Sequence, residues 1–235
     1  AYAYIGGSAK IGSGTVVAHH ATVDGNTVLG KCNQIFPYAF IGGKTHDLKY
    51  KGGNPGLRIG DNNVFREYTT AHCSTADKNF TIIGNNNNIL AYSHIAHDCI
   101  VGDYIVMSSH SALGGHVIVE DHAVIGWGSG AHQFCRIGAY AMLSASSKLV
   151  KDLPPFFMAD GSPAEVCAIN KINMQRNGFS PEEIELVYSA FKLIYRRRLT
   201  RPHAIEELSM RDSSSNRVIK AIIEFANGSS ERGLA

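Results

Sequence analysis

Twelve apolar residues spaced six positions apart constrain the fold of this chain more than any other feature. They are Ile83, Ile89, Ile95, Val101, Met107, Leu113, Val119, Ile125, Ala131, Ile137, Leu143 and Leu149. A period of six fits neither the 3.6-residue turn of a helix nor the alternation of an ordinary strand. It is typical of a parallel β-helix, in which each hexapeptide supplies one short strand and one inward apolar residue. Three strands close a triangular coil, so residues 18 apart should stack at about 4.8 Å.

The repeat also occupies the first part of the chain, where it is interrupted twice. Its earlier members are Ile5, Ile11, Val17, Val23, Leu29, Ile35, Ile41, Ile59, Phe65 and Ala71. Residues 43–57 are polar and glycine-rich, and residues 73–81 also break the register. Both segments are predicted to be loops that leave the coil, and loops on a rigid scaffold often carry binding residues. The pattern ends near Pro154 and Pro155, which predicts a β-helix over residues 1–155.

The remaining residues, 156–235, show helical periodicity and predict a small α-helical C-terminal domain. One helix is expected over residues 164–176. The segment Ser180–Glu183 reads Ser-Pro-Glu-Glu, a capping box with proline at the first helical position, and so predicts the start of a second helix. A last helix is expected over about residues 216–226.

Charge and cysteine content narrow the class of protein. The net charge of +2 argues against nucleic acid as the main partner, because only Arg196–Arg198 forms a basic run. The five cysteines are odd in number and form no C-x-x-C pair, which favours reduced thiols in a cytoplasmic protein. No apolar run is long enough to span a membrane, and no signal peptide is visible. The chain opens inside a repeat without Met, so we expect its true start to be missing.

The register gathers several of the eleven histidines along one edge of the predicted coil. Ile95, Leu113 and Ala131 lie 18 apart, and His97, His116, His132 and Gln133 follow them within three positions. These four side chains should therefore lie within about 10 Å along the coil axis. A corner histidine that only forms a structural hydrogen bond is the alternative for His97. Asp98 and the nearby loop with Asp47 and Lys49 favour a functional role, because a histidine beside a carboxylate can act as a base near neutral pH.

A metal site is the competing interpretation of the other histidines, because some hexapeptide β-helices are zinc enzymes with three histidine ligands. His110, His116 and His122 have a suggestive spacing. Each follows its apolar residue by three positions, so the three fall on different faces of the coil. One subunit could not bring them within the zinc–nitrogen distance of about 2 Å, and only contacts between subunits could do so. We therefore predict no metal.

Several short segments together carry a family resemblance. They are His94–Cys99 (His-Ile-Ala-His-Asp-Cys), Asp47–Tyr50 (Asp-Leu-Lys-Tyr), Gly115–His116, His132–Phe134 (His-Gln-Phe), Asp152–Pro155, Gly178–Ser180 and Arg232–Leu234. In this combination the chain resembles, over nearly its whole length, the UDP-N-acetylglucosamine O-acyltransferases, which start lipid A synthesis. The resemblance implies a left-handed parallel β-helix and a homotrimer with active sites at the clefts between subunits.

The same resemblance implies a reaction and roles for individual residues. A (3-hydroxy)acyl chain would pass from acyl carrier protein to the glucosamine 3-hydroxyl of UDP-N-acetylglucosamine. His97 would be the general base, Asp98 would orient it, and the backbone N–H of Gly115 would stabilise the oxyanion. The implied substrate-binding residues are Asp47, Lys49, His94, His116, His132 and Gln133 for the sugar and phosphates, and Asn170 and Arg176 for the nucleotide. No bound cofactor is implied, because 4'-phosphopantetheine arrives on the carrier protein.

Departures from the family pattern and two alternatives remain at this point. His46 stands where the family commonly has glutamine, while Ile172 and Asn177 replace an acid and a second arginine, which affects the expected nucleotide contacts. One alternative is the N-acyltransferase that acts later on UDP-3-O-acylglucosamine, although that family lacks the Asp-Leu-Lys-Tyr loop. The other is a non-catalytic scaffold paralogue. Retention of His97, Asp98, Gly115 and Gln133 argues against a scaffold.

Overall fold

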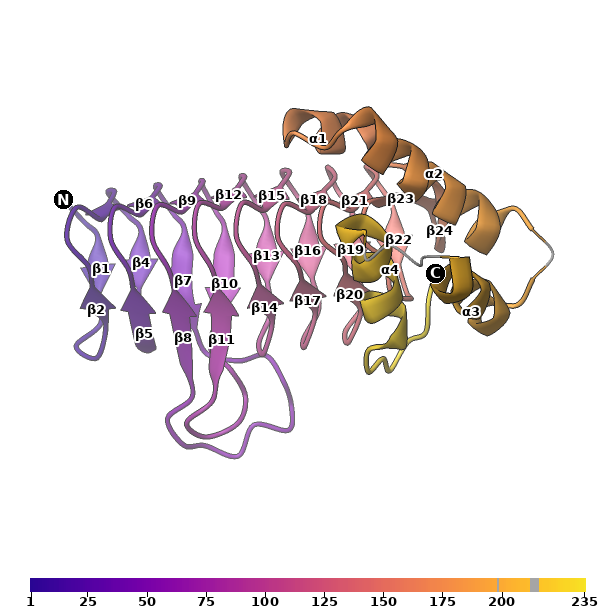
Figure 1. Ribbon diagram of the computed structural model, residues 1–235. Helices are drawn as coiled ribbons and strands as arrows, with labels where there is room; N and C mark the ends of the chain where they lie inside the picture. Colours follow the sequence, from indigo (N-terminus) through magenta and orange to yellow (C-terminus); the bar gives the residue numbers. More distant parts are fainter. Residues whose placement is uncertain (198, 212–215) are drawn as a thin grey trace.

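The chain folds into a three-sided parallel β-helix that carries helices at its C-terminal end (Figure 1). The computed structural model describes residues 1–197, 199–211 and 216–235. The first side, sheet A, contains β1 (Tyr4–Ile5), β4 (Thr22–Val23), β7 (Phe40–Gly43), β10 (Thr70–His72), β13 (His94–Ile95), β16 (Ala112–Leu113), β19 (Gly130–Ala131) and β22 (Lys148–Leu149).

The other two sides have the same construction. Sheet B contains β2 (Lys10–Ile11), β5 (Asn26–Leu29), β8 (Gly56–Ile59), β11 (Phe80–Ile83), β14 (Ile100–Val101), β17 (Ile118–Val119) and β20 (Arg136–Ile137). Sheet C contains β3 (Val16–Val17), β6 (Gln34–Ile35), β9 (Val64–Phe65), β12 (Asn88–Ile89), β15 (Val106–Met107), β18 (Val124–Ile125), β21 (Met142–Leu143), β23 (Phe157–Gly161) and β24 (Ala164–Ile169). We call the corners between successive sheets edge AB, edge BC and edge CA.

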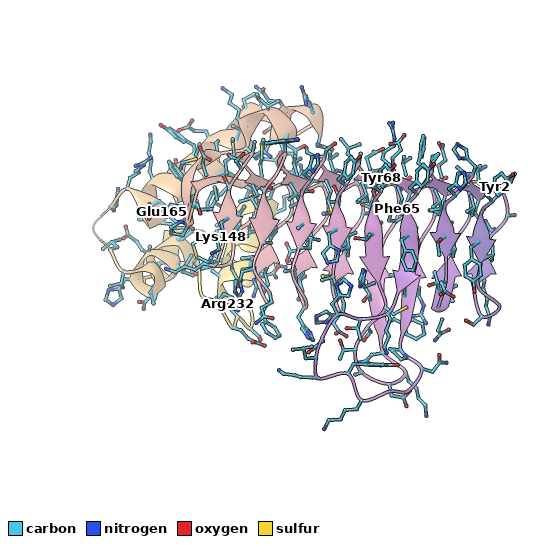
Figure 2. All side chains as sticks on the ribbon, turned by 180° about the vertical axis from the view of Figure 1, so that it is seen from behind. Tyr2, Phe65, Tyr68, Lys148, Glu165 and Arg232 are labelled. Carbon is cyan, nitrogen blue, oxygen red and sulfur yellow. The ribbon has the colours of Figure 1, made fainter. Side chains whose placement is uncertain are left out.

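The pairing register confirms the 18-residue coil. Ile95 pairs with Leu113, which in turn pairs with Ala131. All twelve members of the long apolar series are buried inside the prism, and Phe65 also points into it (Figure 2). Ile5 keeps 44% of its surface exposed because it lies in the first coil, which has a neighbouring coil on one side only. Burial of these apolar side chains between stacked coils is therefore the main favourable contribution to the free energy of folding.

Both interruptions of the repeat project from edge AB. One loop connects β7 to β8 and the other connects β10 to β11, and both extend to the same side of the prism (Figure 1). Non-glycine residues with positive φ turn the corners, among them Asp98 (61°), His116 (61°) and Phe134 (67°) on edge AB. Such left-handed backbone is unfavourable for L-residues, so the neighbouring coils must hold it. The amides of His116 and Phe134 do this by donating to carbonyl groups of the preceding coil, at 3.1 and 3.0 Å.

The helix expected over residues 164–176 is wrong for its first half. Residues 164–169 form β24, which pairs antiparallel with β23, and the helix begins only at Lys171. The side chains of Ala164–Val166 alternate in exposure, a strand-like period that the helical reading of this segment missed. Sheet C thus continues beyond residue 155, and the division into domains of 1–155 and 156–235 stays a prediction.

Four helices follow the strands in the described part of the chain: α1 (Lys171–Arg176), α2 (Pro181–Tyr195), α3 (Arg201–Arg211) and α4 (Arg217–Asn227). The capping box of α2 is confirmed, because the Ser180 hydroxyl accepts from the Glu183 amide while the Glu183 carboxylate accepts from the Ser180 amide. The predicted last helix matches α4 within one residue, whereas α3 was not predicted. Arg198, in the basic run, lies outside the described residues. None of the described helices has the length and apolar character needed to cross a lipid bilayer.

Candidate active site

Edge AB brings together the polar residues that the register places there. His97 and Asp98 lie between β13 and β14, His116 lies between β16 and β17, and His132 and Gln133 lie between β19 and β20. The loop with Asp47 and Lys49 extends from the same edge, between β7 and β8. Residues far apart in the sequence therefore line one side of the prism, as the 18-residue spacing predicts.

His97 and Asp98 form the best-defined polar pair of this edge. Nδ1 of His97 lies 2.8 Å from Oδ2 of Asp98, and both side chains are largely buried, with 13% and 10% of their surface exposed. The carboxylate also accepts from the Ser74 hydroxyl and from the Thr75 amide at 3.2 Å. Burial alone would raise the pKa of Asp98, but the hydrogen bonds from Ser74, His97 and Thr75 outweigh it and hold the pKa below its usual range. Asp98 is thus an ionised acceptor that keeps the proton of neutral His97 on Nδ1, which leaves the Nε2 lone pair free to accept a proton.

Gly115 lies directly against the ring of His97. A methyl group added at Gly115 would stand 2.4 Å from Cε1 and 2.6 Å from Nε2 of His97, closer than nonbonded atoms approach. Only glycine therefore lets the backbone pass this close to the basic nitrogen. A backbone N–H in this position is suited to bind an oxyanion that forms next to the base.

His116 connects the pair to the next coil. Its Nε2 lies 3.7 Å from Oδ2 of Asp98, and its ring meets the ring of His97 edge-on, with a centroid distance of 5.4 Å. On its other side it stacks on Phe134 at 4.7 Å. His116 keeps 40% of its side chain exposed, so it can contact a ligand while its ring stays oriented.

A cavity of about 600 Å³ opens beside these residues. Asp47, Lys49, Asp98 and His116 line it, as the sequence predicts for one site. Three further groups of lining residues were not predicted from the sequence; they come from β8, from the second projecting loop and from β11 and β14. They are Arg58, then Thr75, Ala76, Lys78 and Asn79, and finally Phe80, Ile82 and Ile100. The cations of Lys49, Arg58 and Lys78 suit an anionic ligand such as a diphosphate. The break in the repeat at residues 73–81 was the available signal for this part of the site.

His94 belongs to a second group of imidazoles, next to the pair. Its Nδ1 lies 2.8 Å from the Thr70 hydroxyl, and its ring lies 5.1 Å from that of His72 and 6.0 Å from that of His46. Burial, followed by the proximity of His46 and His94, lowers the pKa of His72 to about 4, and burial also lowers the pKa of His94. His72 and His94 are thus neutral at physiological pH. The repeat does not predict this group, because His46 lies in the β7–β8 loop and His72 is the last residue of β10, where the second loop begins.

His132 and Gln133 contact the end of the chain. The guanidinium of Arg232 donates to Nδ1 of His132 at 2.8 Å and to the backbone carbonyl of Gln133 at 2.9 Å. In Figure 2, Arg232 lies on the same side of the prism as the projecting loops. The C-terminal tail (residues 229–235) therefore reaches edge AB.

Two of the predicted substrate-binding residues lie elsewhere. Asn170 is 4% exposed, and its side-chain amide donates to the carbonyl of Tyr140, a residue of edge BC, at 2.9 Å. Arg176 is exposed at the end of α1, which is also tied to edge BC through a bond from Asn173 to the carbonyl of His122. A single chain does not bring Asn170 and Arg176 together with His97.

The three histidines that suggested a metal site lie on three different edges of one subunit, so one subunit alone does not bring them together. His110 stacks on Tyr92 at edge CA, His116 lies on edge AB, and His122 stacks between Tyr104 and Tyr140 at edge BC. Among the described residues, the one group of possible metal ligands is Asp47, His97 and His116, whose ligand atoms lie within 4.8 Å of one another. This group could hold a metal ion, so the expectation of no metal stays a prediction.

A base paired with a carboxylate, a backbone amide beside it and a hexapeptide prism together define a hexapeptide-repeat acyltransferase. Residues 152–235 match the family model described as "Udp N-acetylglucosamine O-acyltransferase; Domain 2". Curated proteins named acyl-[acyl-carrier-protein]–UDP-N-acetylglucosamine O-acyltransferase are similar over most of their length. The one from Burkholderia lata is 42% identical over 210 residues, which cover 88% of this chain and 80% of that protein. The one from Burkholderia thailandensis is 42% identical over 201 residues, covering 84% and 76%.

Solved structures agree with this assignment. The UDP-N-acetylglucosamine acyltransferase of Francisella novicida superposes with a TM-score of 0.93 at 35% identity, covering 99% of this chain and 92% of that one. The LpxA structure from Acinetobacter baumannii gives 0.92 at 38% identity, with 99% and 93% covered. The chain belongs to the UDP-N-acetylglucosamine O-acyltransferase family, and its fold is the left-handed parallel β-helix that the resemblance implies.

Proposed function

We propose that this protein transfers a (3-hydroxy)acyl chain from acyl carrier protein to the glucosamine 3-hydroxyl of UDP-N-acetylglucosamine, the first step of lipid A biosynthesis. The observation that carries the proposal is the hydrogen-bonded pair of His97 and Asp98 with Gly115 against the imidazole. Named relatives at 42% identity support the same reaction. The pair supplies a base and the neighbouring amide an oxyanion site, which are what acyl transfer to a hydroxyl requires.

The chemical steps follow from the geometry. The sugar 3-hydroxyl attacks the thioester carbonyl while Nε2 of His97 takes the hydroxyl proton. The negative charge that develops on the carbonyl oxygen is stabilised by the N–H of Gly115, and ionised Asp98 stabilises the imidazolium. Collapse of the tetrahedral intermediate breaks the carbon–sulfur bond, and the departing phosphopantetheine thiolate takes the proton back from His97. No step requires a resident cofactor.

The substrate is proposed to occupy the cavity on edge AB. Lys49, Arg58 and Lys78 would face the phosphates. Asp47 would accept hydrogen bonds from sugar hydroxyls, and His116 could accept from them or donate to them. His94, His132 and Gln133 would complete the sugar and phosphate contacts along the edge. The acidic acyl carrier protein would approach the same basic side of the prism.

The site is proposed to be completed in a homotrimer. Asn170 and Arg176 lie at edge BC, so they would reach the nucleotide bound at His97 of a neighbouring subunit. Edge CA exposes a column of stacked rings that includes Tyr68, labelled in Figure 2. Tyr38, Tyr68 and Tyr92 are 45–53% exposed. Trp127, whose ring lies 5.9 Å from that of His110 at the end of this column, is 55% exposed. Exposed aromatic rows of this kind are common where another protein packs. Sedimentation should give a trimer, and a monomer at micromolar concentration would contradict this arrangement.

A cytoplasmic location is part of the proposal. All five cysteines are free thiols, and Cys73, Cys99 and Cys135 are buried. Reduced thiols are typical of the cytoplasm. The relatives are named for acyl carrier protein and UDP-N-acetylglucosamine, and the same two substrates are proposed for this protein.

The direct test is acyl transfer to UDP-N-acetylglucosamine from a panel of 3-hydroxyacyl and plain acyl carrier proteins. Formation of the 3-O-acyl product with one or a few chain lengths is the expected result. If no donor gives product from a folded trimer, the 3-amino analogue of the acceptor should be tried next. Failure of both acceptors would contradict the proposal and favour the scaffold. Product formed only from UDP-3-O-acylglucosamine would identify the N-acyltransferase instead.

A further inference from the structure

We propose that Arg232 is a positioning residue of the active site, which selects the tautomer of His132 and fixes its orientation toward the ligand. The proposal rests on the proposed sugar-nucleotide site at edge AB. Arg232 belongs to the C-terminal tail (residues 229–235), which contacts edge AB but takes no part in the proposed acyl transfer steps. The basis of the proposal is the pair of bonds from one guanidinium to two neighbouring residues of the site.

The guanidinium of Arg232 binds both residues in a fork. Its Nη2 lies 2.8 Å from Nδ1 of His132, and its Nε lies 2.9 Å from the carbonyl oxygen of Gln133. Two bonds from one planar group fix a partner more strictly than a single flexible cation does. The backbone of Gln133 and the ring of His132 are therefore held relative to each other.

The chemistry of arginine decides the tautomer of His132. A guanidinium carries donors only, so Nδ1 of His132 must accept with its lone pair. The neutral ring then carries its proton on Nε2. Since His132 is exposed on edge AB, this N–H is available to donate to a sugar hydroxyl or phosphate oxygen. Without Arg232, Nδ1 could instead carry the proton and donate to the carbonyl of Gln133, 3.3 Å away. The lone pair on Nε2 would then repel a phosphate oxygen and could only accept from a hydroxyl.

The tail delivers Arg232 to this position through bonds that do not involve its side chain. The amide of Asp152 donates to the carbonyl of Gly233 at 2.8 Å, and the amide of Ala235 donates to the carbonyl of Asp152 at 2.9 Å. The Ser230 hydroxyl accepts from the amides of Arg232 and Gly233, at 3.2 and 2.8 Å. Loss of the guanidinium should thus leave the path of the tail intact.

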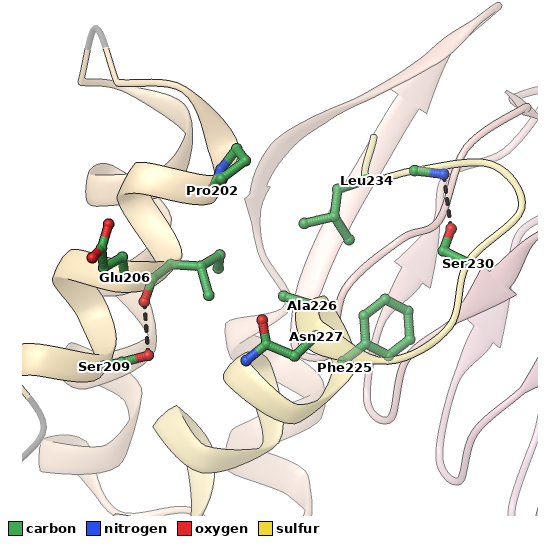
Figure 3. Close-up of a pocket in the computed structure, with 10 residues that line it drawn as sticks. Pro202, Glu206, Ser209, Phe225, Ala226, Asn227, Ser230 and Leu234 are labelled. Atoms are coloured by element: carbon green, nitrogen blue, oxygen red, sulfur yellow. Dashed lines mark hydrogen bonds between the residues drawn. The ribbon is translucent and has the colours of Figure 1, made fainter.

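The opposite side of the tail faces the helices rather than the site. Ser230, Gly233 and Leu234 line an apolar cavity of about 480 Å³ whose other walls come from α3 and α4, among them Ile205 and Phe225 (Figure 3). The tail therefore packs between the helices α3 and α4 on one side and edge AB on the other. Arg232 extends toward this edge, with its guanidinium 6.0 Å from the ring of Phe134, the residue that stacks on His116.

Arg136 provides a matched control for the loss of a tail anchor. It also binds the end of the chain, donating to the carbonyls of Ser229 at 2.7 Å and Phe225 at 2.5 Å, and it stacks over the Phe225 ring. Its guanidinium also lies 3.7 Å from the buried carboxylate of Asp152, so thermal melting must show that Arg136→Met still folds. Within the described part of the chain, its guanidinium forms no hydrogen bond or ion pair with His132 or Gln133. If Arg232 only held the tail in place, Arg232→Met and Arg136→Met should have the same effect on the enzyme.

The test compares Arg232→Met, Arg232→Lys and Arg136→Met with the native trimer. Nitrogen-15 NMR of labelled histidine reports the tautomer of His132, assigned by its loss in His132→Gln. Native protein and Arg136→Met should show the Nε2–H form, whereas Arg232→Met should show a mixture. In kinetics, Arg232→Met should raise KM for UDP-N-acetylglucosamine about tenfold with kcat within about threefold of native, the loss expected for one charge-assisted contact. Arg232→Lys should recover part of KM, and Arg136→Met should leave both constants near native.

An unchanged His132 tautomer in folded Arg232→Met would overturn the proposal, as would equal kinetic effects of Arg232→Met and Arg136→Met. Thermal melting of each variant identifies one that has failed to fold, and Arg232→Lys then provides the comparison. Because the NMR measurement uses the free protein, it stands even if the native chain transfers no acyl group. Failure of the proposed reaction and failure of this inference are therefore distinguishable.

Discussion

Nδ1 of His97 lies 2.8 Å from Oδ2 of Asp98, and this bond decides which nitrogen of the imidazole faces the reacting atoms. Asp98 can serve this purpose because Ser74 and Thr75 already orient its carboxylate. The β10–β11 loop, a break in the repeat, supplies both residues. A loop that leaves the coil thus determines the geometry of a corner one coil further on.

Asp98→Asn is expected to reduce kcat by about a hundredfold or more, because an amide can bind His97 in the wrong tautomer. The corresponding change in the serine protease triad costs about ten-thousandfold, so a hundredfold is a lower bound. The measurement is steady-state acyl transfer at saturating substrate. Asp121→Asn is the matched control, since that carboxylate only accepts from the amide of Asp103 at 2.8 Å, on edge BC. A kcat within threefold of native for Asp98→Asn would contradict an orienting role.

Gly115→Ala is expected to abolish most activity without unfolding the protein. The added methyl would stand 2.6 Å from Nε2 of His97, so the ring must move away from the reacting position. A displacement of about 1 Å costs on the order of a hundredfold in rate. In Gly130→Ala, the control, the methyl meets only the carbonyl oxygen of Ala112 at 3.8 Å, and we expect native activity. Equal activity of the two variants would show that close packing at Gly115 is unimportant.

Stability should fall below neutral pH because of His72. Its pKa is lowered to about 4, mainly by burial, so the unfolded chain binds a proton between pH 6.5 and 4 that the folded chain does not bind. The folded state is therefore fully stable above about pH 6.5 and loses stability as the pH falls toward 4. Between pH 7.5 and 5, His72→Gln should remove about 1 kcal/mol of that loss, after a discount for solvent screening.

Urea unfolding of native protein, His72→Gln and His19→Gln at both pH values measures this effect. His19 is exposed, and its substitution serves as the control that should keep the native pH dependence. If native protein and His72→Gln lose the same free energy of unfolding between pH 7.5 and 5, His72 is not the group responsible.

Mixed trimers test whether one site uses two subunits. His97→Ala and Arg176→Ala should each be strongly impaired alone. When they are coexpressed, about a quarter of the clefts combine native His97 of one subunit with native Arg176 of its neighbour, and activity should return in proportion. A mixture of His97→Ala with Asp98→Asn should stay inactive, because both changes affect the same chain's pair. Absence of any recovery in the first mixture would place both residues within one subunit's site or exclude Arg176.

The hexapeptide series predicts the prism and the edge because both follow from one period. Ile95, Leu113 and Ala131 fix the stacking of three coils, so the corners with His97, His116 and His132 must align. The same period predicts that His110 and His122, which are 12 residues apart, lie on different edges of the prism, as observed. Periodicity predicts the inward residue of each strand but not what the projecting loops bring next to its neighbours. This explains why it missed Lys78 in a loop, His72 at the end of β10 and Arg58 in β8, the strand that follows the first loop. Arg232 is 100 residues from His132 in sequence, and only tertiary packing brings them together.

The helical tail was harder to predict because local preference and tertiary pairing disagree there. Residues 164–169 contain alanine, glutamate and valine in a short run that allows a helix, but pairing with β23 makes them a strand. Ser180 and Glu183, by contrast, form a local capping box that needs no distant partner, and the start of α2 was predicted correctly. Signals contained within one turn can be read from the sequence, whereas those that depend on a distant strand cannot.

The most direct test of the account is the rate of acyl transfer by His97→Ala, measured together with the affinity of the same protein for UDP-N-acetylglucosamine. If Nε2 of His97 removes the hydroxyl proton, kcat should fall by about a thousandfold or more while the dissociation constant changes by less than about tenfold. Sedimentation should show an intact trimer. A His97→Ala trimer that binds the nucleotide and retains a tenth or more of the native kcat would contradict the role of His97 as the base.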